Sequence, residues 1–171
     1  MKTMPKIVAA GRGRTMSSPV IVQTVLDLIK PQDQFRMVYL GTASYDKKSS
    51  FEAQTAPYRA LPHCEVVPLT VSEAAKEIPS QEEIKSTLMS ADAILVSGGN
   101  TLYALNRWKA LGIDEIIQQA LENDTVLCGG SAGAVCWFDS GHSDSMNPAS
   151  WLHVDPRTLT EEEKNDWDYI K

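Results

Sequence analysis

Short apolar runs recur along this 171-residue sequence, and they constrain its fold more than any other feature. The runs are mostly apolar and do not alternate with polar residues, which is typical of strands in a parallel sheet covered on both faces. Longer segments separate them, as in repeated βαβ units. The predicted strands are Lys6–Ala10, Met37–Leu40, Cys64–Leu69, Ala93–Val96 and Thr125–Cys128.

Helical patterns occupy the intervals between these strands. Ser80 with Glu83 has the spacing of a capping box, in which the two side chains satisfy free backbone donors at a helix start. Thr70 with Glu73 has the same spacing and predicts another start. The predicted helices are Val20–Ile29, Gln81–Met89, Thr101–Leu111 and Asp114–Asn123, with Gly112 dividing the last two. The sequence therefore predicts an α/β fold: a three-layer, doubly wound, mostly parallel sheet of the flavodoxin-like kind.

Length and composition predict a single domain over residues 1–171. The chain is 43% hydrophobic and 22% charged, which suffices for a core. Its formal net charge of -6, with scattered Lys and Arg, argues against a nucleic-acid partner. No apolar stretch approaches the roughly 18 residues that cross a membrane. We expect a cytoplasmic protein acting on a small molecule or peptide; its oligomeric state is not defined by the sequence.

Three cysteines, Cys64, Cys128 and Cys136, lie in or beside apolar runs and lack the spacing of metal ligands. Thiols in such places usually act as small hydrophobic groups. We therefore predict neither a metal site nor a bound cofactor.

A glycine-rich turn, Gly11–Arg14, follows the first predicted strand. A dinucleotide-binding turn would need a third glycine where this chain has Met16, so that motif is not met. Arg12 and Arg14 nevertheless stand at the carboxyl end of a strand, where ligands bind in such sheets. One hypothesis is that these arginines contact a substrate carboxylate.

A second turn, Gly129–Gly133, joins the last predicted strand to another apolar run and reads G-x-S-x-G. In a nucleophile elbow, a serine sits on a strained strand-to-helix turn, and flanking glycines let the strand and helix approach closely. Ser131 is therefore the candidate nucleophile. The alternative is a packing turn without chemistry, because small residues at this spacing are common.

A third turn, Gly98–Thr101, follows the fourth strand and is expected to line the same crevice. Attack on a carbonyl needs backbone N–H donors for the developing oxyanion. Ala132, after the serine, supplies one donor, and Gly99 is the natural source of the second because it has no side chain in the way. Asn100 is also placed to cap the helix that follows.

Together, the turns Gly98–Thr101 and Gly129–Ala134 resemble those of the peptidase E family of serine dipeptidases and their cyanophycinase relatives. The resemblance covers most of the chain and implies a fold like that of the class I glutamine amidotransferases. It implies that Ser131 is the nucleophile and that Gly99 and Ala132 hold the oxyanion. It also implies hydrolysis of short peptides at an N-terminal residue, with aspartate as the expected side chain.

The tract Cys136–Ser145 resembles one branch of this family, and Asn100, His142 and Asp144 are the substrate-side candidates. A serine nucleophile needs a base, usually a histidine held by a carboxylate. Family members carry both partners well after the elbow, so we expect this sequence to lack the part of the family fold that holds them. His142, which stands near Asp139 and Asp144, is the internal alternative.

Two other functions stay open at this point. The chain is a related serine hydrolase acting on other amides, such as isoaspartyl or cyanophycin-like peptides, or it is a catalytically silent binding module. Panels of competing dipeptides distinguish the related hydrolase from a dipeptidase. A serine-reactive probe distinguishes the silent binding module from an active enzyme.

Overall fold

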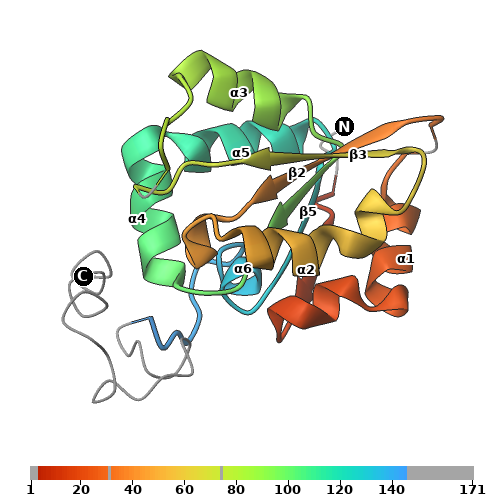
Figure 1. Ribbon diagram of the computed structural model, residues 1–171, viewed down its shortest axis with the longest axis horizontal. Coiled ribbons are helices and arrows are strands. Elements are labelled where there is room, and N and C mark those ends of the chain that lie inside the picture. Colours follow the sequence, from red (N-terminus) through yellow and green to blue (C-terminus); the bar gives the residue numbers. More distant parts are fainter. Residues whose placement is uncertain (1–3, 31, 74, 146–171) are drawn as a thin grey trace.

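Five parallel strands form one sheet in a computed structural model that describes residues 4–30, 32–73 and 75–145 (Figure 1). Across the sheet the order is β1 (Ile7–Ala10), β5 (Val126–Gly130), β4 (Ala93–Val96), β2 (Phe35–Leu40) and β3 (Cys64–Leu69). Every neighbouring pair is parallel. The five predicted strands are confirmed, and β5 runs on into the glycines of the last turn.

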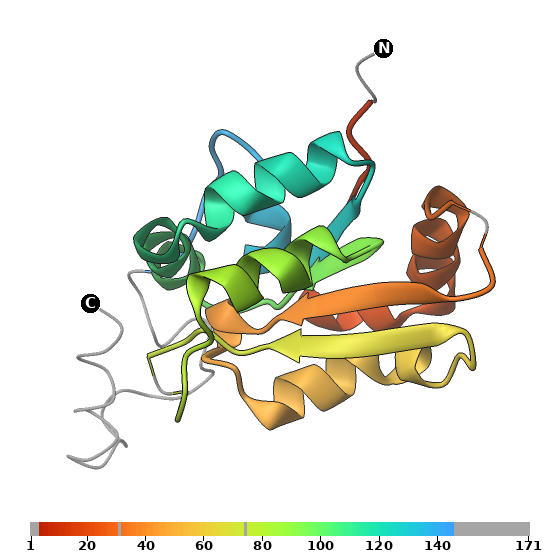
Figure 2. The ribbon, with the colours of Figure 1, turned by 90° about the horizontal axis from the view of Figure 1, so that it is seen from above.

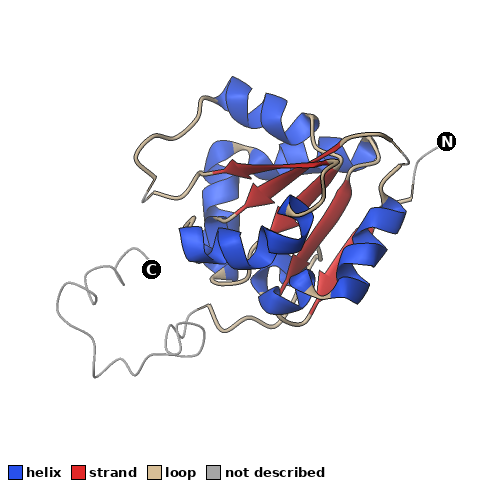
Figure 3. Ribbon diagram, turned by 45° about the vertical axis from the view of Figure 1, so that its right-hand side comes forward, coloured by secondary structure: helices blue, strands red, loops and turns tan. Residues whose placement is uncertain are grey.

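Helices cover both faces of the sheet, which confirms the three-layer architecture (Figure 3). One face is covered by α1 (Pro19–Leu28) and α2 (Lys48–Arg59), and the other by α3 (Gln81–Met89), α4 (Thr101–Leu111) and α5 (Ile113–Glu122). Figure 2 shows α3 and α5 running alongside each other. Buried side chains on the first face include Val25 and Tyr58, and those on the second include Ile84, Trp108 and Ile117.

The topology brings three strand ends together. From β1 the chain passes to β2 and β3, then returns through β4 and β5 to lie beside β1, with Ala10 opposite Gly130. Because crossovers between parallel strands are right-handed, this reversal sends the helices after β2 and β4 to opposite faces. Ligands bind at such a reversal, at the carboxyl ends of the strands. The turns after β1, β4 and β5 therefore adjoin.

Helix α3 begins with the predicted capping box. The hydroxyl of Ser80 accepts from the backbone N–H of Glu83, and the Glu83 carboxylate accepts from the Ser80 backbone N–H at 2.8 Å. Helices α4 and α5 are separated at Gly112, whose φ of +64° is left-handed and favours glycine. These predicted helices are confirmed.

The predicted helix start at Thr70 is wrong, because no described residue between 70 and 80 is helical. The backbone donors there have other acceptors. The carboxylate of Asp46 accepts from the N–H groups of Val71 and Ser72 at 2.8 and 2.7 Å. The N–H of Glu73 donates to the hydroxyl of Tyr103 at 2.9 Å. Side chains from distant segments thus satisfy three backbone donors here, including the Glu73 N–H that a capping box would have satisfied.

Helix α2 was not predicted from the sequence, and it contains Pro57. Proline has no N–H, so the carbonyl of Ala53 loses its partner within the helix. The hydroxyl of Ser17 donates to that oxygen at 2.8 Å instead. Ser17 ends the short 3-10 helix η1 (Gly13–Ser17), so this bond ties the turn after β1 to α2.

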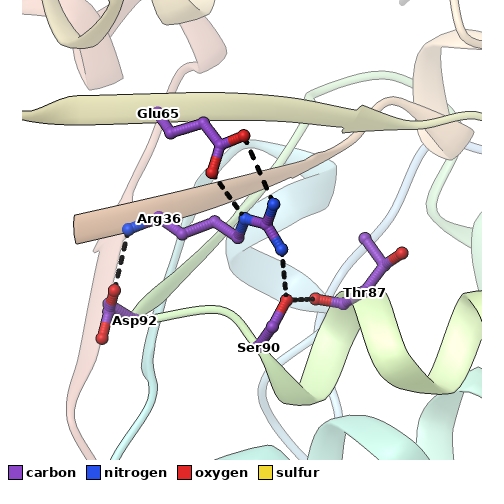
Figure 4. Close-up of polar contacts among 5 residues, drawn as sticks. All are labelled: Arg36, Glu65, Thr87, Ser90 and Asp92. Carbon is purple, nitrogen blue, oxygen red and sulfur yellow. Dashed lines mark hydrogen bonds and ion pairs between the residues drawn. The ribbon is translucent and has the colours of Figure 1, made fainter. Parts of the chain in front are cut away.

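Charged side chains join the elements at the amino end of the sheet (Figure 4). The guanidinium of Arg36 on β2 donates to both carboxylate oxygens of Glu65 on β3, at 2.8 and 3.3 Å, and to the hydroxyl of Ser90 at 2.9 Å. The carboxylate of Asp92 accepts from the Arg36 backbone N–H at 2.7 Å. The network therefore connects β3, β2 and the turn that leads into β4.

None of the helices in the described part of the chain is long and apolar enough to cross a membrane.

Candidate active site

Ser131 lies between the last residue of β5 and the first residue of α6 (Ala132–Val135). Its φ of +56° and ψ of -118° fall in a region that side chains disfavour and glycine occupies readily. Its backbone N–H donates to the carbonyl of Ala10 at 2.9 Å, and the residue is exposed. Strained backbone of this kind gathers at functional sites. The turn therefore presents a serine side chain to solvent at the carboxyl end of the sheet.

Glycines on either side allow backbone segments to touch. A Cβ added to Gly133 would overlap the carbonyl oxygen of Val96 on β4, and one added to Gly129 would overlap that of Gly133. A Cβ on Gly130 would overlap the carbonyl oxygen of Arg12. The Ser131 turn is thus packed against β4 on one side and against the turn after β1 on the other.

The turn after β4 adjoins the serine. A Cβ added to Gly98 would lie 3.4 Å from the Cβ of Ser131. Gly99 has a φ of +137°, and a side chain there would overlap the carbonyl oxygen of Ala43. That oxygen accepts from the N–H of Asn100 at 2.7 Å. The structure therefore brings Ser131 and the Gly98–Thr101 turn together, and glycine is required at position 99.

The backbone N–H groups of Gly99 and Ala132 are available as donors. Neither donates to an acceptor among the residues that the structure describes. Ala132 is buried and Gly99 is half-buried, and a buried N–H in a compact protein nearly always has a partner, so these two N–H groups are candidate donors to a ligand oxygen.

Asn100 caps α4 and is buried. Its side-chain oxygen accepts from the N–H of Tyr103 at 2.9 Å, and its amide nitrogen donates to the carbonyl of Ser145 at 3.4 Å. The hydroxyl of Ser145, also buried, accepts from the N–H of Leu102 at 3.2 Å and pairs with that of Ser143 at 2.7 Å. The residues after α6 are therefore held at the start of α4, beside the Gly98–Thr101 turn.

His142 and Asp144, the other two substrate-side candidates, are exposed in this anchored segment. His63 lies at the opposite end of the sheet, where its ring meets that of Phe35 edge to face with centroids 5.5 Å apart. His153 falls outside the described residues.

Thiols close to the turn are held in the neutral form. Burial raises the pKa of Cys136 to about 12 and raises that of Cys128 further above the usual range. Burial, with a smaller contribution from the charge of Glu65, also raises the pKa of Cys64 to about 12. The thiolate is the reactive form of cysteine, so burial disfavours reaction at these three thiols.

A separate hollow of about 660 Å³ opens at the same end of the sheet, beyond the turn after β2. Its described lining comes from Tyr45, Asp46 and residues 70–83, with none from Gly98–Thr101 or the Ser131 turn. Geometry around the serine, rather than the size of this hollow, locates the candidate site.

Comparisons with known proteins identify the family of this chain. The sequence model of peptidase family S51 matches residues 7–156. The chain belongs to peptidase family S51. It is 35% identical over 152 residues to the uncharacterized peptidase YgaJ of Bacillus subtilis, a match that covers 87% of this chain and 63% of that relative. It is 33% identical over 99 residues to the uncharacterized peptidase Lmo0363 of Listeria monocytogenes, covering 58% of this chain and 46% of the other.

Solved structures of related proteins have the same fold. A putative peptidase E protein from Listeria monocytogenes superposes with a TM-score of 0.61 at 24% identity, over 78% of this chain and 61% of that one. A peptidase from an acI-B1 actinobacterium superposes with a TM-score of 0.60 at 20% identity, over 77% and 56%. Together with the match to peptidase family S51, this shared fold confirms the resemblance to the peptidase E family.

Two features of this family S51 site were missed from the sequence. The first is the carbonyl of Ala43, which lies against Gly99 and belongs to the 3-10 helix η2 (Thr42–Ser44). The indole N–H of Trp108 donates to the hydroxyl of Thr42 in that helix at 3.1 Å. The buried hydroxyl of Ser145 anchors the segment after α6. No local pattern marks either residue, since each acts through a partner more than 40 positions away.

Proposed function

We propose that this chain carries the nucleophile and oxyanion hole of a serine peptidase that hydrolyses short peptides. The observation that carries the proposal is the exposed Ser131 on a strained turn, in contact with Gly98 and beside two unused backbone donors. Membership of peptidase family S51 supports the reaction class. The chain spans 63% of the length of YgaJ, so the activity of the whole protein belongs to the proposal.

In the proposed reaction, the Oγ of Ser131 attacks the carbonyl carbon of a peptide bond while a base takes the hydroxyl proton. The carbonyl oxygen becomes an oxyanion, which accepts hydrogen bonds from the N–H groups of Gly99 and Ala132. The C–N bond then breaks, and the amine leaves with the proton from the base. Water hydrolyses the acyl-enzyme and restores the serine hydroxyl.

Serine is the better nucleophile here, although two cysteines lie within five positions of it. Burial holds Cys128 and Cys136 as neutral thiols, whereas Ser131 is exposed. A reagent that modifies activated serines therefore discriminates between these side chains.

A fluorophosphonate probe tests the proposal. We expect covalent labelling of the full-length protein, in which the base is present, and complete loss of labelling in Ser131→Ala. Ser140→Ala is the matched control, since Ser140 is also exposed and follows the same turn. Absence of labelling in the folded protein would support the silent binding module instead.

The base is tested by the same probe. Because the base is expected to be another residue, His142→Ala should label at the rate of the unmodified full-length protein. Loss of labelling in that variant would assign the base to His142 and correct the expectation that the base lies elsewhere.

Substrate preference is a further part of the proposal. We expect dipeptides with N-terminal aspartate to be hydrolysed faster than those with asparagine, as the family resemblance implies. Preference for isoaspartyl or cyanophycin-like peptides in the same panel would favour the related hydrolase.

A further inference from the structure

We propose that Trp108 is a positioning residue for the proposed oxyanion hole, because its indole meets both of the segments that hold the backbone donors. The inference rests on the proposed function, which assigns those donors to Gly99 and Ala132. Trp108 acts on Gly99 through Thr42 and on Ala132 through Trp137.

Gly99 is held in place by the segment that follows β2. On one side of it, the N–H of Ser97 donates to the carbonyl of Leu40 at 3.0 Å. On the other side, the N–H of Asn100 donates to the carbonyl of Ala43 at 2.7 Å. The Ala43 oxygen is also so close to Gly99 that a Cβ on the glycine would overlap it. The position of the Gly99 N–H therefore depends on where the residues from Leu40 to η2 lie.

Trp108 in turn holds η2. Its indole N–H donates to the hydroxyl of Thr42 at 3.1 Å, and both side chains are buried. Trp108 lies on α4, which begins at the end of the Gly98–Thr101 turn. The contacts therefore form a closed ring, in which Ala43 holds the turn, the turn leads into α4, and α4 holds η2. Because a buried N–H without an acceptor is costly, the bond to Thr42 favours one position of η2.

The same indole meets the segment that begins at Ala132. The rings of Trp108 and Trp137 are stacked, with centroids 6.1 Å apart and an interplanar angle of 29°. Trp137 follows α6, whose first residue is Ala132, and the N–H of Cys136 donates to the Ala132 carbonyl at 3.1 Å. Ala132 and Trp108 belong to one buried core cluster, and Trp137 packs against it. Trp108 therefore lies between the supports of Gly99 and of Ala132.

An oxyanion hole needs both donors to reach one oxygen, at about 2.7 to 3.1 Å from it. Gly99 and Ala132 belong to different turns, so contacts between segments set the distance between their N–H groups. A displacement of about 1 Å in a catalytic geometry costs on the order of a hundredfold in rate. Loss of the Thr42 contact, which supports only one of the donors, should therefore cost about tenfold.

The rate at which a fluorophosphonate labels Ser131 in the full-length protein tests this inference. In the proposed reaction the phosphonyl oxygen occupies the oxyanion hole, so the rate depends on both donors, whereas the final extent of labelling counts folded molecules. Thr42→Val removes the acceptor for Trp108 at nearly constant volume. We expect labelling about tenfold slower than in the unmodified protein but reaching the same extent. Thr42→Ser keeps a hydroxyl and should label at close to the unmodified rate.

Double variants separate the two sides of Trp108. Trp108→Phe keeps an aromatic ring but removes the N–H, so it should also slow labelling. Combined with Thr42→Val, it should be no slower than the slower single variant, because both remove one hydrogen bond. Trp137→Phe should slow labelling as well, and its effect should multiply with that of Thr42→Val, because the two contacts support different donors. An unmodified rate in Trp137→Phe would overturn the assignment to Ala132.

Thr125→Val is the matched control. Thr125 is also buried, and its hydroxyl donates to the carbonyl of Ala91 at 2.9 Å at the amino end of the sheet. This variant should lower the urea midpoint but label at the unmodified rate. An unmodified rate in Thr42→Val, or equal slowing in Thr125→Val, would overturn the inference and leave the proposed function in place. Absence of labelling in the unmodified full-length protein would overturn both.

Discussion

The two ends of the sheet are assembled from different contacts. At the carboxyl end, backbone meets backbone: Gly99 against Ala43, Gly130 against Arg12 and Gly133 against Val96. At the amino end, charged side chains connect the elements, with the guanidinium of Arg36 at the centre of the network in Figure 4.

The two ends therefore differ in how precisely their segments are positioned and in how well they tolerate substitutions. Backbone contacts at van der Waals distance fix the relative positions of three turns, but they leave no space for a single methyl group. Long side chains at the surface rearrange when one partner is lost, and exposed ion pairs contribute little to stability. The candidate site therefore stands at the end where geometry is fixed and substitution is restricted.

The largest expected effect is at Gly99. Gly99→Ala places a Cβ over the carbonyl oxygen of Ala43 in a residue with φ of +137°, so the free energy of unfolding should fall by about 3 to 5 kcal/mol. Gly112→Ala is the control: φ is +64° but the space is open, so only strain of about 1 kcal/mol is expected. Similar urea midpoints for the two variants would contradict the role of backbone contact.

The next effect has the opposite sign. Ser131→Gly should relieve the strained backbone and raise the free energy of unfolding by about 1 kcal/mol relative to Ser131→Ala, which keeps it. Both variants should lose labelling by fluorophosphonate. If Ser131→Gly is less stable than Ser131→Ala in urea, the backbone at this turn is not strained.

Substitution of Ser17 tests whether a side-chain hydrogen bond contributes to stability at the carboxyl end of the sheet. Ser17→Ala leaves the carbonyl of Ala53 without its donor and should cost about 1 kcal/mol. In a Pro57→Ala background the helix regains an N–H for that carbonyl, so the same substitution should cost less. Equal costs in the two backgrounds, measured by urea unfolding, would show that the bond does not replace the one that proline removes.

The smallest effect is expected at the amino end. Hydrogen bonding to the Arg36 guanidinium lowers the pKa of Glu65 below its usual value of about 4.3. A lowered folded pKa adds stability above the usual value, and this is lost as the pH falls through the lowered pKa. Glu65→Gln should therefore lower the urea midpoint slightly at pH 7 and less at pH 3. In an Arg36→Ala background this pH dependence should disappear.

Much of the fold could be predicted because the strands are apolar runs and most helices carry local signals, such as the Ser80 capping box. Helix α2 could not, since its sequence is polar, includes Pro57 and depends on Ser17 far upstream. The capping-box spacing at Thr70 predicted a helix that does not form, and this error also comes from distant residues. Asp46 and Tyr103 accept from backbone N–H groups that the local pattern assigns to a helix start.

The candidate site was predicted to a similar extent. Ser131, Gly99 and Ala132 could be selected because glycine-rich turns after strands are visible locally. That Gly99 rests on Ala43, or that Arg12 meets Gly130, depends on the order of strands across the sheet, which no single segment encodes.

The bond from Ser17 to Ala53 also bears on the order of folding. An isolated α2 segment lacks one intrahelical hydrogen bond at its centre, and short helices are marginal in water even when intact. Helix α2 therefore gains its full stability only once η1, 36 positions upstream, has docked. Formation of this helix and placement of the turn beside Ser131 are, on this account, one cooperative event.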